Sequence, residues 1–259
     1  MSGNIMVTAI AAARKAGCLL KDNLGGPRSI EYKGAVDLVT EMDRRAEALI
    51  VDEISSAFPG HGILTEESAE QRPASSVRWI IDPLDGTTNY AHGYPVFCVS
   101  IAVEERGKTV FGCVHNPMLD ELFTAEHNAG AYLNGTRISV SSTAFLGQGL
   151  LATGFPYDIR TSKLNNLDHF AAFAKRAQAI RRAGSAALDL SYAACGRFDG
   201  FWEMKLKPWD TAAAALILKE AGGEITDFSG APFSIHGNEC LASNGLIHEE
   251  MLCVLGPGR

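Results

Sequence analysis

The sequence lacks most of the patterns that mark disulfide-rich, zinc-binding, membrane-spanning and nucleic-acid-binding proteins. Its six cysteines form no C-x-x-C pair and share no zinc-ligand spacing with the seven histidines. No apolar run is long enough to cross a bilayer, and no block of lysine and arginine interrupts a net charge of −7. We therefore expect buried thiols in a soluble cytoplasmic protein whose main partner is neither a membrane nor nucleic acid.

Acyl-transfer signatures are missing as well. There is no G-x-S-x-G and no suitably spaced Cys/His pair, so a covalent acyl-enzyme is not indicated. The chain does have the means to fold, because 259 residues with 46% hydrophobic content can bury a large core. A Ser/Thr/Gly-rich stretch without periodicity, residues 139–149, predicts a boundary between an N-terminal half, 1–140, and a C-terminal half, 141–259.

One stretch, WIIDPLDGTTNY at residues 79–90, combines an apolar run with two acids. Residues 78–81 form a short segment in which Trp79, Ile80 and Ile81 follow Arg78 as a continuous apolar run, which is typical of a strand covered on both faces. Because Pro83 has no N–H for a sheet ladder, we expect the strand to end at Asp82.

The residues after that strand suggest a mouth for metal ions and phosphate. The sequence Asp85-Gly86-Thr87-Thr88 can form a turn that aims backbone N–H groups at an anion. Asp82, Asp85 and the carbonyl of Leu84 can supply oxygen ligands to a hard cation. Ordinary turn chemistry explains the same string and stays open here.

Three other acids have both a structural and a functional interpretation. Asp43 has capping-box spacing from Thr40, and Asp210 stands at a predicted helix start, as an N-cap would. Glu66 precedes a polar loop at 68–76, which we predict to be a mobile flap. An exposed loop edge is the structural alternative for Glu66.

A site built from Glu66, Asp82, Asp85 and Asp210 would repel a phosphate monoester unless cations balanced its charge. Two unit charges about 4 Å apart interact by roughly 4 kcal/mol at an effective dielectric near 20. Oxygen ligands of this kind favour Mg²⁺ over zinc.

Three motifs in this order resemble the inositol monophosphatase family of Mg-dependent, lithium-sensitive phosphatases, a superfamily that includes fructose-1,6-bisphosphatase. Residues 79–90 resemble the first signature, residues 207–223 the second, and residues 64–68 the acidic loop, with Thr65 where many relatives have Gly. The resemblance implies an α+β fold, a layered α-β-α-β-α sandwich with an N-terminal α+β half and a C-terminal α/β half. It also implies a site between the halves and a homodimer.

The resemblance further implies a mechanism. Two to three Mg²⁺ ions would bind to Glu66, Asp82, the Leu84 carbonyl, Asp85 and Asp210. A water activated by the metals, oriented by Glu66 and Thr87, would attack phosphorus in line, with Asp43 hydrogen-bonded to Thr87. The N–H groups of Gly86 and Thr87 would hold the phosphate.

The substrate side is implied by matches to family positions. Glu203 matches a contact to substrate hydroxyls, with solvent-exposed surface as the alternative; Gly184 and Ser185 match a segment that lines the same pocket, and Asp85 and Asp210 would also face the substrate. Nucleotide-phosphate phosphatases of the superfamily usually have Lys after Asp-Gly-Thr. Thr88 stands here, which favours inositol 1-phosphate or a related sugar or polyol phosphate.

Other functions stay open. Lys205 and Lys207 would suit the second phosphate of fructose 1,6-bisphosphate, although strand-edge lysines are usually just solvated, and histidinol phosphate is a further candidate. An interaction protein is the alternative of another class, because some bacterial relatives regulate transcription by binding RNA polymerase.

The periodicities predict the following elements. Helices are expected at 4–22, from Thr40 to Phe58, at 164–177, at 186–194 and from Asp210 to Gly222. Strands are expected at 62–66, 98–103, 109–115, 121–125, 150–153, 201–204 and 224–228, with a hairpin turn at Asn134-Gly135 within an antiparallel meander.

Overall fold

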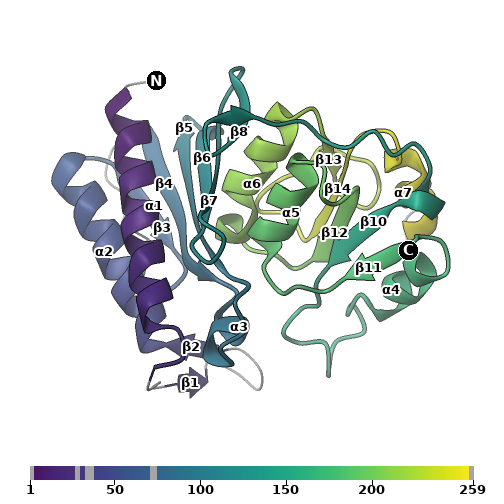
Figure 1. Ribbon diagram of the computed structural model, residues 1–259, viewed down its shortest axis with the longest axis horizontal. Coiled ribbons are helices and arrows are strands. Elements are labelled where there is room, and N and C mark those ends of the chain that lie inside the picture. Colours follow the sequence, from purple (N-terminus) through teal and green to yellow (C-terminus); the bar gives the residue numbers. More distant parts are fainter. Residues whose placement is uncertain (1–2, 27–29, 33–37, 71–74, 257–259) are drawn as a thin grey trace.

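The computed structural model describes residues 3–26, 30–32, 38–70 and 75–256 and has five alternating layers of helix and sheet. In Figure 1 the layers run from α1 and α2, through the first sheet, α5 and α6, and the second sheet, to α4 and α7. The predicted α-β-α-β-α sandwich is confirmed.

The first layer consists of α1 (Gly3–Asn23) and α2 (Glu41–Ala57), two amphipathic helices that pack on each other and on the first sheet. α2 begins with the predicted capping box: the hydroxyl of Thr40 accepts from the N–H of Asp43, and the carboxylate of Asp43 accepts from the N–H of Thr40. The cap therefore fixes Asp43 at the first turn of α2.

The first sheet has the order β3-β4-β5-β6-β7-β8-β9. Its strands are β3 (Gly62–Thr65), β4 (Val77–Asp85), β5 (Cys98–Glu105), β6 (Lys108–Asn116), β7 (Glu121–Glu126), β8 (Gly130–Leu133) and β9 (Thr136–Arg137). β3 and β4 are parallel, and the rest form the predicted antiparallel meander. Asn134 and Gly135 both have positive φ, 49° and 79°, as the predicted two-residue hairpin turn requires.

The expectation that the strand ends at Asp82 is wrong. β4 continues through Pro83 to Asp85, with a register shift between Asp82, which pairs with Ser100, and Asp85, which pairs with Cys98. A bulge tolerates proline inside a sheet because the extra residues need no ladder hydrogen bond. The sequence-based prediction treated Pro83 as the end of the strand and did not consider a bulge that would let the strand continue.

The middle layer holds α5 (Ala186–Ala194) and α6 (Pro208–Glu220), which are buried on nearly every side. One apolar cluster joins Ile80 and Phe123 of the first sheet to these helices and to Phe201 and Ala242 of the second. The core is therefore continuous across the layers, and the division at residue 140 stays a prediction.

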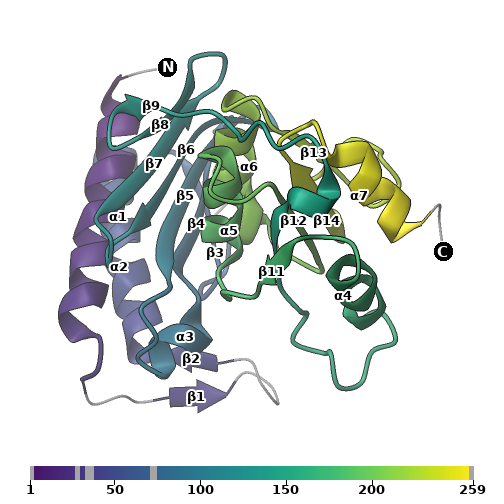
Figure 2. The same ribbon diagram turned by 45° about the vertical axis from the view of Figure 1, so that its right-hand side comes forward.

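The second sheet has the order β11-β10-β12-β14-β13. Its strands are β10 (Leu150–Thr153), β11 (Ala179–Arg181), β12 (Gly200–Met204), β13 (Glu224–Thr226) and β14 (Glu239–Ser243), covered outside by α4 (Leu167–Ala174) and α7 (His248–Leu255). Figure 2 shows α4 and α7 on the far side of this sheet from α5 and α6.

Two predicted elements are too long. The helix expected at 164–177 covers only Leu167–Ala174, because Asn166 has a φ of 70° and cannot continue a helix backwards. The strand expected at 224–228 ends at Thr226, because the carboxylate of Asp227 accepts from the N–H groups of Ser229 and Ala231 and closes a turn.

Smaller elements complete the described chain: the β1 (Ile30–Tyr32) and β2 (Leu38–Thr40) hairpin, α3 (Thr87–Ala91) and a 3₁₀ turn at Leu146–Gln148. Of the loop predicted at 68–76, residues 71–74 lie outside the described ranges. Among the residues that the structure describes, no helix is long and apolar enough to cross a membrane.

Candidate active site

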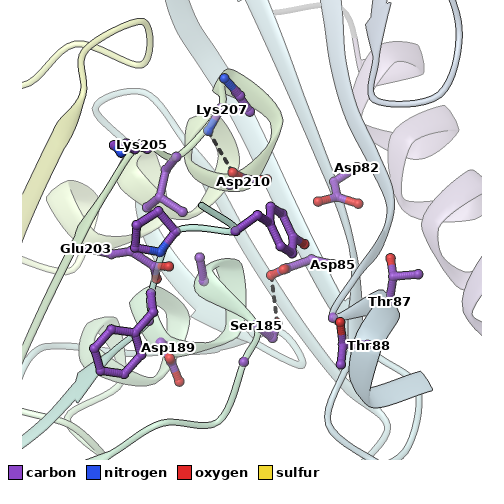
Figure 3. Close-up of a pocket in the computed structure, with 18 of the residues that line it drawn as sticks. Asp82, Asp85, Thr87, Thr88, Ser185, Asp189, Glu203, Lys205, Lys207 and Asp210 are labelled. Atoms are coloured by element: carbon purple, nitrogen blue, oxygen red, sulfur yellow. Dashed lines mark hydrogen bonds between the residues drawn. The ribbon is translucent and has the colours of Figure 1, made fainter. Parts of the chain in front are cut away.

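A cavity of about 360 Å³ opens where the middle helices meet the ends of strands from both sheets. Its lining includes Glu66 after β3, residues 82–88 from β4 into α3, residues 153–158 after β10, residues 184–189 at the start of α5, and residues 203–210 from β12 into α6. Figure 3 shows the acidic side chains that face it.

Asp82 is the most deeply placed of the predicted metal ligands, with 2% of its surface exposed. Its Oδ1 accepts a 3.0 Å hydrogen bond from the N–H of Leu84. Burial raises its pKa well above the usual range, and the nearby charges of Glu66, Asp85 and Asp210 raise it further. All three of those charges are negative, so Asp82 is held among acids.

Asp85 joins the first sheet to α5. Its Oδ2 accepts hydrogen bonds from Ser185 Oγ at 2.7 Å and from the N–H of Ala187 at 2.8 Å. Burial raises the pKa of Asp85, and these hydrogen bonds act in the opposite direction. The contacts fix one carboxylate oxygen and the orientation of the group at the cavity (Figure 3).

The sequence suggested that Asp210 is the N-cap residue of its helix, and this is wrong. α6 begins at Pro208, and Asp210 is its third residue, with Oδ2 accepting from the N–H of Lys207 at 2.7 Å. Proline is favoured in the first helical turn, and this shifts the start upstream. Burial and then the charge of Asp85 raise the pKa of Asp210 to about 8.

Thr87 is the point where α2 and the cavity meet. Its Oγ1 lies 2.8 Å from Oδ1 of Asp43 and 3.1 Å from the carbonyl oxygen of Leu84. The other oxygen of Asp43 accepts from the N–H and hydroxyl of Thr40. The contact between Thr87 and Asp43 that the resemblance implies is therefore present, although burial still raises the pKa of Asp43.

Gly86 precedes α3 with a φ of 104°, a conformation that side chains disfavour. A Cβ there would also lie 2.9 Å from the carbonyl oxygen of Val96. Both constraints require glycine where the chain turns from β4 into α3, at the edge of the cavity.

Glu66 follows β3, is half-buried and lines the cavity. The loop that carries it is held by Glu47, a buried acid of α2 that sequence reasoning missed. One oxygen of Glu47 accepts from the N–H of Glu67 at 2.9 Å and the other from the hydroxyl of Ser68. Because Glu66 is itself half-buried at the cavity, it is not the fully solvated loop edge that the alternative describes.

Glu203 of β12 lies on the opposite wall and is 9% exposed, so the exposed-surface alternative is wrong. Its carboxylate packs against the backbone of Gly154, where a Cβ would come within 2.1 Å of Oε1. Burial raises the pKa of Glu203 to about 8, against the lowering effect of Arg182.

Two lysines predicted as alternatives for a second phosphate line the cavity. Lys205 is engaged, because its Nζ lies 2.7 Å from Oδ2 of Asp158 and 2.9 Å from Oγ of Ser162. It holds the loop after β10 against β12. The backbone N–H of Lys207 donates a hydrogen bond to the carboxylate of Asp210, so the main chain at Lys207 helps to position Asp210.

Sequence reasoning did not select Arg182, Asp158 or Asp189, which also line the cavity. Asp189 had a detectable signal, because it is the single charged residue in the otherwise apolar and small run AALDLSYAA. Arg182 and Asp158 lie in polar segments and had no comparable signal.

The donor set fits a hard divalent cation. Its members are carboxylates and a backbone carbonyl, they share one cavity, and mutual repulsion raises the pKa of Asp82. Within the described ranges, no three acidic, histidine or cysteine side chains already form a compact cage. A bound cation would draw together carboxylates that repel one another without it.

Comparison with known proteins decides the family. The profile of the inositol monophosphatase family matches residues 3–256, which include every element described above. The chain belongs to the inositol monophosphatase family.

Individual relatives of this family member carry two kinds of name. It is 44% identical over 247 residues to the Nus factor SuhB of Escherichia coli, covering 94% of this chain and 92% of the relative. It is 45% identical over 245 residues to an inositol-1-monophosphatase of Synechocystis, covering 94% and 85%. A crystal structure of the extragenic suppressor protein suhB from Bartonella henselae superposes with a TM-score of 0.93 at 41% identity, covering 99% of this chain and 100% of that one.

Proposed function

We propose that this protein is a Mg²⁺-dependent phosphomonoesterase that hydrolyses inositol 1-phosphate or a related sugar or polyol phosphate. The observation that carries the proposal is the group of buried acids around Asp82, whose electrostatic neighbours are all negative. Such a group is costly unless positive charge is supplied from outside the chain. Family membership and the inositol-1-monophosphatase relative support the same reaction class.

The residues that would hold Mg²⁺ are Glu66, Asp82, the carbonyl of Leu84, Asp85 and Asp210. When bound, Mg²⁺ supplies charge neutralisation and lowers the pKa of water, which is the chemistry that phosphoryl transfer to water needs. One oxygen of Asp85 accepts from Ser185, and one oxygen of Asp210 accepts from the N–H of Lys207. Both carboxylates are therefore oriented before an ion binds.

Thr87 and Asp43 would orient the attacking water. The hydroxyl of Thr87 has one proton, and when it donates to Asp43 its oxygen lone pairs remain available to a water. Glu66, which lines the same cavity, would be the second acceptor for that water. The N–H groups of Gly86 and Thr87 would hold the phosphate, in a turn that the φ of Gly86 makes possible.

The alcohol part of the substrate would contact Glu203, with Gly184 and Ser185 beside it and Asp85 and Asp210 between alcohol and phosphate. Fructose 1,6-bisphosphatase or histidinol-phosphatase specificity is the alternative. The engagement of Lys205 with Asp158 disfavours a second phosphate at that residue, because the ammonium group already has a carboxylate partner.

The test is phosphate release from myo-inositol 1-phosphate, fructose 1,6-bisphosphate, histidinol phosphate and 3′-phosphoadenosine 5′-phosphate. Each is assayed with Mg²⁺, with EDTA and with added Li⁺. Turnover that requires Mg²⁺ and is inhibited by Li⁺ supports the proposal, and the preferred ester identifies the substrate. Folded protein without turnover on any ester would refute it.

A second candidate is a regulatory role as an interaction protein that binds RNA polymerase. The observation that favours it is the Nus factor name of the Escherichia coli relative at 44% identity. Pull-down of RNA polymerase by wild type and by Asp82→Asn tests it. Binding that survives this substitution would support a role separate from catalysis. If the wild type captures no RNA polymerase, the regulatory role is refuted.

The homodimer stays part of the proposal. Light scattering during size-exclusion chromatography, with and without Mg²⁺, measures the mass directly. A mass near twice the 27.7 kDa of one chain is expected.

A further inference from the structure

Asp189 is a buried acid at the cavity that none of the proposed steps uses. It lies on α5 one turn after Ser185, and its N–H donates to the Ser185 carbonyl at 3.0 Å. Only 1% of its surface is exposed, yet it lines the cavity on the side of Glu203 (Figure 3).

The carboxyl group of Asp189 has no hydrogen-bond donor among the described residues. Its Oδ1 is fully buried without a partner, which distinguishes it from the neighbouring acids. Asp85 has Ser185 and Ala187, and Asp210 has the N–H of Lys207. An unpaired buried polar group destabilises the fold, so an acid in this position needs a compensating partner.

The surroundings of Asp189 define what partner would suit it. Burial raises its pKa well above the usual range, and the negative charges of Glu203 and Asp85 add to this, while Arg182 acts against them. Whether or not the acid is ionised, a carboxyl oxygen without a donor can accept a hydrogen bond. An alcohol hydroxyl can donate that bond and therefore matches this group.

The wall that carries Asp189 is polar on more than one side. Glu203 has a pKa near 8 and also lines the cavity, and Arg182 lies at its exposed edge with donors only. The acids of the metal cluster lie on the other side, toward β4 and the start of α6 (Figure 3). An ester whose phosphate is at the metal cluster would therefore direct its alcohol toward Asp189 and Glu203.

We propose that Asp189 is a specificity-determining residue that hydrogen-bonds a hydroxyl of the substrate's alcohol, so that the cavity selects phosphate esters of polyols over esters of apolar alcohols. The inference rests on the proposed phosphatase function and assigns a substrate class to the wall opposite the metal ligands. It adds a residue that neither the family signatures nor the sequence patterns selected.

The experiment compares two esters that differ only in their hydroxyls, myo-inositol 1-phosphate and cyclohexyl phosphate, at saturating Mg²⁺. For Asp189→Leu, which keeps the side-chain size, we expect kcat/KM for the inositol ester to fall at least tenfold, mainly through KM. Turnover of cyclohexyl phosphate should stay within about twofold of wild type, since it offers no hydroxyl to Asp189. Asp189→Asn, which keeps a donor and an acceptor, should retain most of the selectivity.

Two controls separate recognition from folding. Ser191→Ala changes a buried polar residue of the same helix whose hydroxyl donates to the Ala187 carbonyl and which does not line the cavity. It should leave the selectivity ratio unchanged. If Asp189→Leu does not fold, Asp189→Ala is measured in the same way.

The outcomes are distinct. An equal loss on both esters would mean that Asp189 has a structural role and would overturn the proposal. So would an unchanged ratio in both apolar variants. If wild type hydrolyses neither these two esters nor any ester of the phosphate-release panel, the proposed function itself fails. A wild type that hydrolyses the inositol and cyclohexyl esters equally overturns only the role of Asp189.

Discussion

At the scale of single residues, the site is defined by carboxylates that the fold keeps close to one another and away from water. Asp82 is the centre of this group, since Glu66, Asp85 and Asp210 all raise its pKa. Holding these like charges together lowers the stability of the folded protein, and bound cations would offset that loss.

Asp82→Asn should reduce turnover to less than a tenth of wild type, because it removes one negative charge from the proposed metal cluster. Its amide oxygen can still accept from the N–H of Leu84, so the melting temperature without metal should be unchanged or higher. Phosphate-release assays and thermal melts measure both effects. Asp168→Asn, at an exposed acid of α4, is the matched control, and residual activity above a tenth would count against the site.

Glu203 gives a pH prediction. Its pKa is about 8 in the folded protein against 4.5 ordinarily, so between these values the folded state binds more protons than the unfolded chain. The free energy of unfolding should therefore fall as pH rises, by at most about 1.4 kcal/mol per pH unit from this group. Urea unfolding of metal-free protein from pH 5 to pH 8 tests this against Glu203→Gln, whose slope should be flatter. Parallel curves would show that Glu203 does not titrate in this way.

At the scale of elements, α2 connects two parts of the site that are far apart in the sequence. Asp43 holds the hydroxyl of Thr87, and Glu47, one turn later, holds the loop that follows Glu66. A single helix thereby sets the positions of both groups proposed to orient water.

We expect Glu47→Ala to affect activation by Mg²⁺ more strongly than it affects the substrate KM. Without Glu47 the N–H of Glu67 loses its acceptor and the position of Glu66 loosens, so we expect the Mg²⁺ concentration for half-activation to rise about tenfold. The substrate KM at saturating Mg²⁺ should change little. Glu53→Ala, which removes only an exposed pair with Lys15, is the control. A lower melting temperature with an unchanged Mg²⁺ response would mean that Glu47 only stabilises the fold.

At the scale of the whole molecule, one apolar cluster spans both sheets and the two helices between them. Ile80 of the first sheet and Ala242 of the second belong to one cluster through α5 and α6. The cavity lies at the edge of this cluster, and its ligands come from both sides of it.

Calorimetry should therefore show one unfolding transition, with equal calorimetric and van't Hoff enthalpies, although the sequence suggested two halves. Adding Mg²⁺ should raise the transition temperature, and EDTA should reverse the rise without splitting the peak, because ions that bind only the folded state stabilise it by mass action. Two resolved transitions would show that the halves around residue 140 unfold separately.

The three motifs, through their resemblance to the family, implied the layered fold and the groups proposed to carry the chemistry, and local patterns predicted individual elements. β-branched runs and amphipathic periodicity predicted β10, β12 and α5 closely, because their local preferences agree with their burial. Element ends were less predictable. The continuation of β4 past Pro83 depends on pairing with β5, and the start of α6 at Pro208 was hidden by the apparent cap at Asp210.

The sequence by itself determined the identity of the acids and their order in three motifs, because oxygen-rich cation and phosphate chemistry restricts which residues can serve. Only the tertiary structure decided which other residues join them. Glu47 and Asp189 have no motif, and their importance comes from burial beside chain segments that are distant in sequence. Whether a carboxylate is solvated, paired or left without a donor is set by the packing of neighbouring layers, which local spacing does not encode.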